Sequence, residues 1–301
     1  MINLNDYIIA EETPEFNLSI KLVIPSGCGM KCPFCFNKLN ANTAVLDKEG
    51  FMKNFINSLN TIIDAAGPKR SISLDITGNE PTHDIDLFKN VMKSLKNIKH
   101  KFNKIVLTSN GENIKAVAPD MNGVIDFVNV SVHHYDFEGR YTAFGCPDHY
   151  LTESMYQYMN SMLHRYGMKI TAVAVLYKEL NETFVSFLRN FSSWCTRMQF
   201  DNIRLRSNFY KKDDFFTRYL NDNTFGGEII RAEGLNSKMI NVNGQDILLL
   251  QGVPSLVGHV VGVEAVVDDN GLPYIDYGKE HPFEKRYIDH VYVNNRTQNV
   301  N

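Results

Sequence analysis

The first two thirds of the chain alternate between short apolar runs rich in β-forming residues and segments whose apolar residues repeat at helical spacing. Because strands that alternate with helices form parallel βαβ units, this alternation constrains the fold more than any other feature. The apolar runs are 18–25, 71–77, 104–109, 126–132, 169–176 and 202–206, and the helical segments include 51–63, 87–98, 151–166 and 183–194. We predict an α/β fold, a partial (β/α)6 TIM-like barrel, with a closed barrel and an open doubly wound sheet as the alternatives.

From about Thr224 the pattern changes to short strands joined by tight turns. Asn-Gly at 243–244 and Asp-Asn-Gly at 269–271 each lie between two apolar runs, which is a strong hairpin signal. We therefore predict three parts. They are an N-terminal segment over 1–17, the partial barrel over 18–223, and a small β-rich C-terminal extension over 224–301 that packs on the barrel.

Length, charge and composition exclude several broad classes of protein. With 301 residues, 44% of them hydrophobic, the chain is long enough to bury a large core. A net charge of −3 gives no electrostatic basis for binding nucleic acid. Five cysteines are too sparse for a secreted disulfide framework, and no apolar stretch reaches the roughly 20 residues that span a membrane. Because the N-terminus does not resemble a signal peptide, we expect a cytoplasmic protein without a membrane partner.

Three cysteines, Cys28, Cys32 and Cys35, lie within eight residues directly after the first predicted strand. Cysteine thiolates hold iron–sulfur clusters, and structural or electron-carrying clusters usually have four protein ligands. Three cysteines therefore suit three irons of a cubane cluster and leave the fourth iron open to another ligand. The alternative is a structural zinc site with His83 as a fourth ligand. Only two other cysteines remain, 49 positions apart, so no second cysteine-ligated cluster is expected.

Each predicted strand is followed by a polar or glycine-containing segment. These segments are the cysteine loop, 77–82, 108–111, 131–136, 177–179 and 204–208. Parallel strands of a barrel all end at one face, and such enzymes place their active sites there. We therefore expect these segments to meet at one mouth.

The cysteine loop in this setting resembles the radical S-adenosylmethionine (SAM) superfamily, over about residues 18–207. That family's motif has three cysteines separated by three and then two residues, with an aromatic residue just before the last. Cys28, Cys32, Cys35 and Phe34 match every element. The resemblance implies a [4Fe–4S] cluster on the three thiolates and SAM on the fourth iron. It also implies reductive cleavage of SAM to methionine and a 5′-deoxyadenosyl radical, which abstracts a substrate hydrogen.

The same resemblance assigns residues to SAM. Gly78-Asn79-Glu80-Pro81 is similar to the family's Gly-Gly-Glu-Pro motif, with Glu80 as the partner of the methionine ammonium group. Asn79 stands where the family has glycine, and asparagine tolerates left-handed backbone angles. Further contacts with SAM are implied for Phe34, Phe36, Asn37, Ser109, Asn110, Ser131 and His133.

Two histidines and one cysteine are candidates with competing explanations. Alternation along a strand sends His133 and His134 to opposite faces, so at most one of them faces the barrel interior. We assign the SAM or substrate role to His133. Cys146 is a candidate hydrogen-atom donor to a substrate radical, with an ordinary loop thiol as the alternative.

Arg204, Arg206 and Asn208 are the candidates for substrate binding. Alternation places both arginines on the same side of the sixth strand. If that side is the interior, they suit a carboxylate or phosphate group, because a buried arginine requires a partner. If it is the exterior, they are simply solvated.

We therefore predict a radical SAM enzyme that acts on a small polar substrate and receives electrons from an external one-electron donor such as flavodoxin or ferredoxin. Two alternatives stay open. One is a radical SAM maturase or activase that acts on a peptide or protein, and the other is a non-catalytic regulatory module that binds iron–sulfur or zinc.

Overall fold

The computed structural model describes residues 17–35, 47–66, 71–145, 151–208, 214–232, 235–252, 263–268 and 270–275. Its first six strands are β1 (Asn17–Ile24), β2 (Ser71–Gly78), β3 (Lys104–Ser109), β4 (Phe127–Ser131), β5 (Lys169–Leu176) and β6 (Asn202–Ser207). The helices are α1 (Lys48–Ala66), α2 (Ile85–Ile98), η3 (Lys99–Lys101, 3-10), α3 (Ile114–Met121), α4 (Phe137–Phe144), α5 (Glu153–Arg165), α6 (Phe184–Arg197) and α7 (Asp214–Asn221). The C-terminal strands are β7 (Ile229–Ala232), β8 (Leu235–Val242), β9 (Gln245–Gly252), β10 (Val263–Val267) and β11 (Pro273–Ile275).

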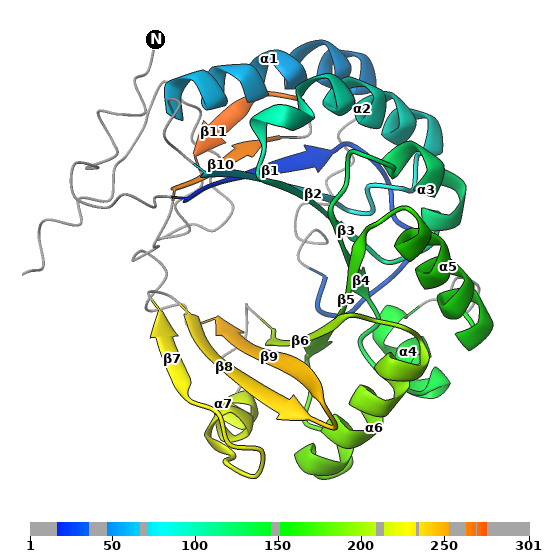
Figure 1. Cartoon of the computed structure of the whole chain (residues 1–301), viewed down its shortest axis with the longest axis vertical. Coiled ribbons are helices and arrows are strands. Elements are labelled where there is room, and N and C mark those ends of the chain that lie inside the picture. The colour runs from blue at the N-terminus through cyan, green and yellow to red at the C-terminus, as the bar shows by residue number, and fades with distance from the viewer. Residues whose placement is uncertain are drawn as a thin grey trace, which may run out of the picture.

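All of the described strands belong to one sheet, in the order β11-β10-β1-β2-β3-β4-β5-β6-β9-β8-β7. β1 to β6 are parallel neighbours, and β10 and β9 pair in parallel with β1 and β6. Figure 1 shows this sheet curving around an inner face, with α1, α2, α3, α5 and α6 on its outer side. The predicted partial barrel is confirmed, and among the described strands the sheet does not close.

The core lies between the outer face of the sheet and the helices. In β2, Ile72, Leu74 and Ile76 are buried, and the residues between them are partly exposed. The register sets Leu74 beside Ile105 of β3, so apolar side chains of neighbouring strands share the helix side. Each such side chain contributes about 1.5–3 kcal/mol when fully buried. The packing of the outer face against the helices therefore stabilises the fold, and the inner face does not contribute to this core.

Helix boundaries follow local signals in the sequence. Asp84 precedes α2 and accepts a hydrogen bond from the backbone N–H of Leu87 at 3.0 Å, which satisfies one of the free donors of the first turn. Thr183 caps α6 in the same way by accepting from the backbone N–H of Ser186 at 3.2 Å. α3, α4 and α7 were not predicted, because each has only eight residues and too few turns to display a period.

The inner face of the sheet is polar. The strand positions that alternate with the buried ones include Ser19 and Asp75, whose side chains share a hydrogen bond of 3.2 Å. Arg204 and Arg206 of β6 also alternate with buried Ile203. Closed barrels of this class fill their interior with branched apolar side chains. The polar inner face of this sheet suits a binding surface rather than a packed core.

The C-terminal strands confirm the predicted β-rich character of this part and differ from the expected placement. They continue the barrel sheet at both edges, with β10 and β11 beyond β1 and β7 to β9 beyond β6, instead of forming a separate layer packed on it. Both predicted hairpins form, β8–β9 around Asn243, whose φ is 54°, and β10–β11. The boundary at residue 224 between the barrel and the C-terminal extension stays a prediction.

No helix among the described residues combines the length and the apolar character needed to cross a bilayer.

Candidate functional site

The cysteine loop begins directly after β1 ends at Ile24. Cys28 is exposed and Cys32 and Cys35 are half-buried, and none of the three forms a disulfide with another described cysteine. The backbone N–H of Cys35 donates to the carbonyl of Cys32 at 3.1 Å, so the second half of the motif is a tight turn. The backbone N–H of Met30 points at Sγ of Cys28 over 3.4 Å. Such donors stabilise a thiolate, which is the form that binds metal.

Two neighbouring segments hold this loop in place. On one side, the backbone N–H of Glu80 donates to the carbonyl of Gly27 at 3.0 Å, and the hydroxyl of Ser26 donates to the carbonyl of Glu80. On the other side, the backbone N–H of Lys31 donates to the carbonyl of Phe144 at the end of α4, at 2.7 Å. The loop that carries the cysteines is therefore fixed between the ends of β2 and α4.

The Glu80 carboxylate is the buried centre of this arrangement, with only 1% of the residue exposed. Oε1 accepts hydrogen bonds from the hydroxyl and the N–H of Thr82, at 2.7 and 3.0 Å, and from the hydroxyl of Ser109 at 2.7 Å. Oε2 accepts one from the N–H of Asn110 at 2.6 Å. Burial raises the pKa of Glu80, and these four donors oppose the increase. Glu80 thus joins the loops that follow β2 and β3.

Asn110 connects this carboxylate to the cysteines. Its side-chain amide nitrogen lies 3.7 Å from Sγ of Cys28, while its amide oxygen accepts the N–H of Glu112 at 2.8 Å. The sequence predicted that strand-end segments would meet at one mouth. For the ends of β1, β2 and β3, these contacts confirm that prediction.

The Gly78-Asn79 turn differs from the expectation. Gly78 has φ of 150°, and a Cβ at this position would lie 2.7 Å from the carbonyl oxygen of Ile24, so the close approach of β1 requires glycine. Asn79 is not among the described residues with positive φ. Its side-chain amide instead donates to the carbonyl of Ser26 at 3.0 Å. Asn79 therefore adds a contact to the cysteine loop that a glycine cannot make.

An aromatic cluster lies beside the last cysteine. The ring of Phe34 lies 4.7 Å from those of both His133 and Tyr177, and His133 lies 5.0 Å from Phe144. Tyr177 follows β5 and was not singled out as a site residue. Its only signal was its strand-end position, which predicts where a residue lies but not what it touches.

His133 is buried in this cluster with φ of 58°. Its Nδ1 accepts the backbone N–H of Val175 at 3.1 Å, which holds the ring between β4 and β5. Burial, assisted by the charge of Arg206, lowers the pKa of His133 to about 3. The histidine is therefore neutral at physiological pH and suits a hydrogen-bonding or packing role rather than a cationic one.

His134 lies apart from this cluster, as predicted, but for a different reason. β4 ends at Ser131, so strand alternation does not extend to either histidine. The left-handed backbone of His133 separates them instead. His134 packs against Tyr135 and against Phe187 of α6 on the outer side, with Asp136 at 3.3 Å.

The three cysteines fit a cluster better than a zinc ion. In the described part of the chain, no three His, Cys, Asp or Glu side chains converge on a point that would hold one metal ion. His83, the proposed fourth zinc ligand, instead pairs with Glu112 at 3.6 Å. A cubane needs no such convergence, since each thiolate binds a different iron. Although Cys28 as a whole residue is exposed, desolvation of its sulfur by the surrounding protein raises the pKa of the thiol to about 11. Ligation must therefore supply the energy of its deprotonation.

The remaining site candidates fall into three groups. Phe36, Asn37 and Cys146 lie outside the described residues. Cys195, which lies outside the cysteine loop, is fully buried in α6 and packs in the core. Ser131 ends β4 on the inner face, half-exposed, beside Val173 of β5.

The two arginines of β6 point to the inner side of the sheet. Arg204 is partly buried, its pKa is lowered by burial, and the charge of Asp75 on β2 opposes that decrease. Because β3, β4 and β5 separate these two strands in the sheet, the two charges face each other across its concave side. Asn208, directly after β6, is buried.

A family model described as "4Fe-4S single cluster domain" matches residues 20–141. This region contains the cysteine loop, Glu80 and Asn110, the residues that the structure brings together. No curated protein matches the chain.

Several solved structures resemble the fold. SuiB of Streptococcus suis, bound to its precursor peptide SuiA, is 20% identical over 69% of this chain and 46% of its own, with a TM-score of 0.47. The anSMEcpe protein with bound AdoMet is 16% identical over 68% of this chain and 56% of its own, with a TM-score of 0.49. Methylornithine synthase (PylB) is 12% identical over 64% of this chain and 54% of its own, with a TM-score of 0.43. This chain matches about half the length of each of these proteins.

The matched family is defined by a single [4Fe–4S] cluster, and the cysteine spacing, the parallel sheet and the buried Glu80 occur together within the matched region. The part of the chain that carries these residues is therefore similar to a 4Fe-4S single cluster domain.

Proposed function

We propose that this protein is a radical SAM enzyme that acts on a small polar substrate carrying an anionic group. The observation that supports this most is the chain of contacts from Cys28 through Asn110 to Glu80, which unites the cysteine loop with the loops after β2 and β3. When bound, a reduced [4Fe–4S] cluster with SAM supplies a 5′-deoxyadenosyl radical able to abstract hydrogen from unactivated carbon. Cys28, Cys32 and Cys35 would hold the cluster.

The residues around the loop suit the polar groups of SAM. A carboxylate has about four lone-pair sites, and Oε2 of Glu80 accepts one hydrogen bond, so it retains capacity for the ammonium group of the methionine moiety. Asn110 has an amide donor near Cys28, and Ser131 has a hydroxyl on the inner face at the same end of the sheet. Phe34 and Tyr177 offer apolar surface beside the cysteines.

The inner face suggests the charge of the substrate. Arg204 has a buried Nε without a hydrogen-bond partner among the described residues. The negative charge of Asp75 raises the pKa of Arg204, against the effect of burial. Arg206 occupies the next inward position on β6, close enough to His133 to influence its pKa. A carboxylate or phosphate group can accept hydrogen bonds from the N–H donors of a guanidinium that have no other partner. Arg204 would thus orient such a group on the inner face of the sheet.

A peptide substrate would meet the same arginines through an acidic side chain or its C-terminus. The two kinds of substrate are separated by a labelling experiment, in which small anionic metabolites and acidic peptides are deuterated and incubated with the enzyme and SAM. Transfer of deuterium into 5′-deoxyadenosine identifies the substrate class. The proposal expects transfer from a small anionic compound, and transfer only from peptides would overturn that part.

The cofactor assignment is tested by anaerobic reconstitution with iron and sulfide. We expect about four iron atoms per chain and a change in the electron paramagnetic resonance signal of the reduced cluster when SAM is added. Cys32→Ala should lose both, whereas Cys195→Ala, which alters a buried thiol of α6, should retain both. Binding of one zinc ion without sulfide would support the regulatory-module alternative instead.

A further inference from the structure

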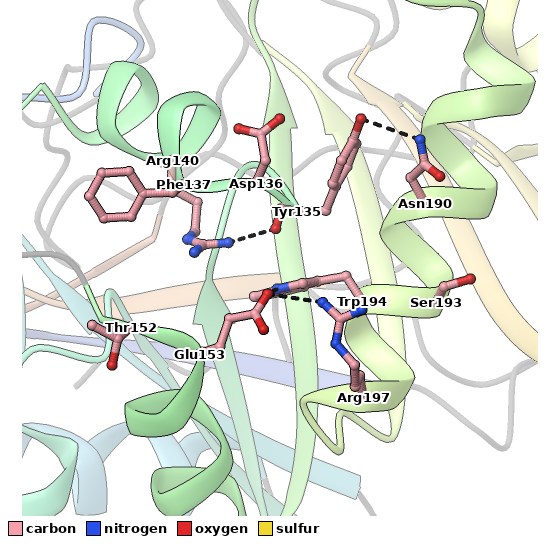
Figure 2. A pocket seen from close by; sticks show the side chains of 10 residues that line it. All are labelled: Tyr135, Asp136, Phe137, Arg140, Thr152, Glu153, Asn190, Ser193, Trp194 and Arg197. Atoms are coloured by element: carbon pink, nitrogen blue, oxygen red, sulfur yellow. Dashed lines mark hydrogen bonds and ion pairs between the residues drawn. The ribbon is translucent and has the colours of Figure 1, made fainter.

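A cavity of about 590 Å³ lies on the outer side of the sheet, away from the cysteine loop. It is formed by the segment after β4, by α4, and by the facing parts of α5 and α6 (Figure 2). Its lining residues are Tyr135, Asp136, Phe137, Arg140, Thr152, Glu153, Asn190, Ser193, Trp194 and Arg197. The volume is within the usual range for sites that bind small molecules. None of the residues assigned to the cluster, to SAM or to the substrate lines it.

Arg140 is the unusual residue of this cavity. It is only 2% exposed, yet no carboxylate of the described residues lies within ion-pair distance of its guanidinium. One terminal nitrogen donates to the carbonyl of Tyr135 at 2.7 Å, and Nε is buried without a hydrogen-bond partner among the described residues. Interior arginines are costly unless an anion or several acceptors compensate them.

The two acidic side chains of the cavity, Glu153 and Asp136, form hydrogen bonds and ion pairs with groups other than Arg140. Glu153 accepts hydrogen bonds from the indole N–H of Trp194 and from Arg197, each at 2.9 Å. Asp136 caps α4 through the N–H of Gly139 at 2.6 Å and pairs with His134. Figure 2 shows the carboxylate of Asp136 directed away from the guanidinium of Arg140, and that of Glu153 directed toward Trp194 and Arg197. Among the described residues, the guanidinium of Arg140 therefore has no carboxylate partner.

Aromatic rings fix the guanidinium and add apolar surface. Cζ of Arg140 lies 5.0 Å from the ring centroid of Trp194 and 5.7 Å from that of Tyr156. These cation–π contacts orient the planar fork, and a planar fork matches the two oxygens of a carboxylate. Phe137, half-exposed at the rim, offers a surface for the apolar body of a ligand.

We propose that this cavity is a second binding site, separate from the radical SAM centre, for a small organic carboxylate with an apolar or aromatic body, with Arg140 as the residue that recognises the carboxylate. The site is independent of the proposed function, because it shares no residue with the cysteine loop or the inner face.

The chain provides its own reporter, since Trp194 is the only tryptophan among 301 residues. The reconstituted full-length protein is titrated with phenylacetate while the tryptophan fluorescence is followed, and binding is confirmed by calorimetry. Phenylacetamide has the same shape without the charge, and phenyl phosphate tests the other common anion. We expect saturable binding of phenylacetate and binding of phenylacetamide that is at least about tenfold weaker.

Two variants test the role of Arg140. Arg140→Lys keeps the charge and loses the planar fork, and we expect it to weaken phenylacetate binding by about tenfold or more. Arg165→Gln removes an exposed cation at the end of α5 that does not line the cavity, and should leave binding unchanged. Equal binding of phenylacetate and phenylacetamide by the wild-type protein would overturn the proposal without any variant. Tighter binding of phenyl phosphate than of phenylacetate would overturn the carboxylate assignment, and so would no saturable signal at all.

Discussion

The backbone N–H of Asn110 donates to Oε2 of Glu80 over 2.6 Å, and the side-chain amide of the same asparagine lies 3.7 Å from Sγ of Cys28. One residue at the end of β3 thus couples a buried carboxylate of the β2 loop to a cysteine of the β1 loop. Substitutions that disturb either loop should therefore affect the other loop as well.

Glu80→Gln should destabilise the protein although it preserves the shape of the side chain. The carboxylate oxygens accept from four donors, so an amide NH2 must face at least one N–H or O–H donor and leave it unsatisfied. An unsatisfied buried donor costs about 1–3 kcal/mol. Urea unfolding of the cluster-free protein measures this loss. Glu138→Gln, an exposed acid of α4, is the matched control and should have a free energy of unfolding close to that of the wild type.

Gly145→Ala should impair cluster assembly. This residue ends α4 with φ of 60°, and an added Cβ would lie 2.7 Å from the carbonyl oxygen of Lys31 in the cysteine loop. Gly123→Ala is the control, because Gly123 has φ of 72° but nothing within 4 Å of an added Cβ. Both variants should lose about 1–2 kcal/mol from the left-handed backbone. Only Gly145→Ala should also bind less iron after reconstitution, and equal iron content in the two would contradict the proposed contact.

His133 should make folding stability depend on pH. Its pKa is about 3 in the folded protein and about 6.5 when exposed, so between these values the unfolded chain binds more protons. Its contribution to stability is therefore present above pH 6.5 and is lost as the pH falls toward 3. Between pH 6.5 and 5 the loss should be about 2 kcal/mol.

Urea unfolding of the wild type and of His133→Gln over this pH range tests the assignment. The difference between the two proteins should shrink by about this amount as the pH falls from 6.5 to 5. His100→Gln removes an exposed histidine and should follow the wild-type profile. A difference between the wild type and His133→Gln that does not vary with pH would show that His133 titrates normally.

Arg204→Gln should separate substrate binding from SAM cleavage. Its guanidinium faces the inner side of the sheet, and we assign it to the anionic group of the substrate. Using the substrate identified by deuterium transfer, the apparent KM should rise by about tenfold or more, while 5′-deoxyadenosine formation without substrate stays unchanged. Arg218→Gln, an exposed arginine paired with Glu179, should alter neither. Loss of uncoupled cleavage in Arg204→Gln would indicate a role in SAM binding instead.

Much of the fold and part of the site were predictable from the sequence. β1 to β6 were predicted within one or two residues, because β-branched and other apolar residues recur at every second position along most of them. The meeting of the cysteine loop with Glu80 and Asn110 followed from parallel topology, since all strand carboxyl ends share one edge.

Other features depend on contacts that leave no local signal. The pairing of β9 with β6 and of β10 with β1 joins segments distant in the sequence, and a hairpin motif does not say which edge it extends. The hydrogen bond from Asn79 to Ser26 joins the loop after β2 to the loop after β1. The sequence does not show how closely these two loops approach each other. The outer cavity, with Arg140 between Trp194 and Tyr156, joins three helices, one of which was too short to predict.

The most direct test of the central claim is the formation of 5′-deoxyadenosine by the anaerobically reconstituted protein with dithionite and SAM, followed by chromatography. The account predicts 5′-deoxyadenosine and methionine in equal amounts from the wild type and from Cys195→Ala. It predicts none above the protein-free background from Cys28→Ala, Cys32→Ala or Cys35→Ala. A wild-type protein that binds a full cluster and yields no 5′-deoxyadenosine, or a triad variant that still yields it, would contradict the assignment.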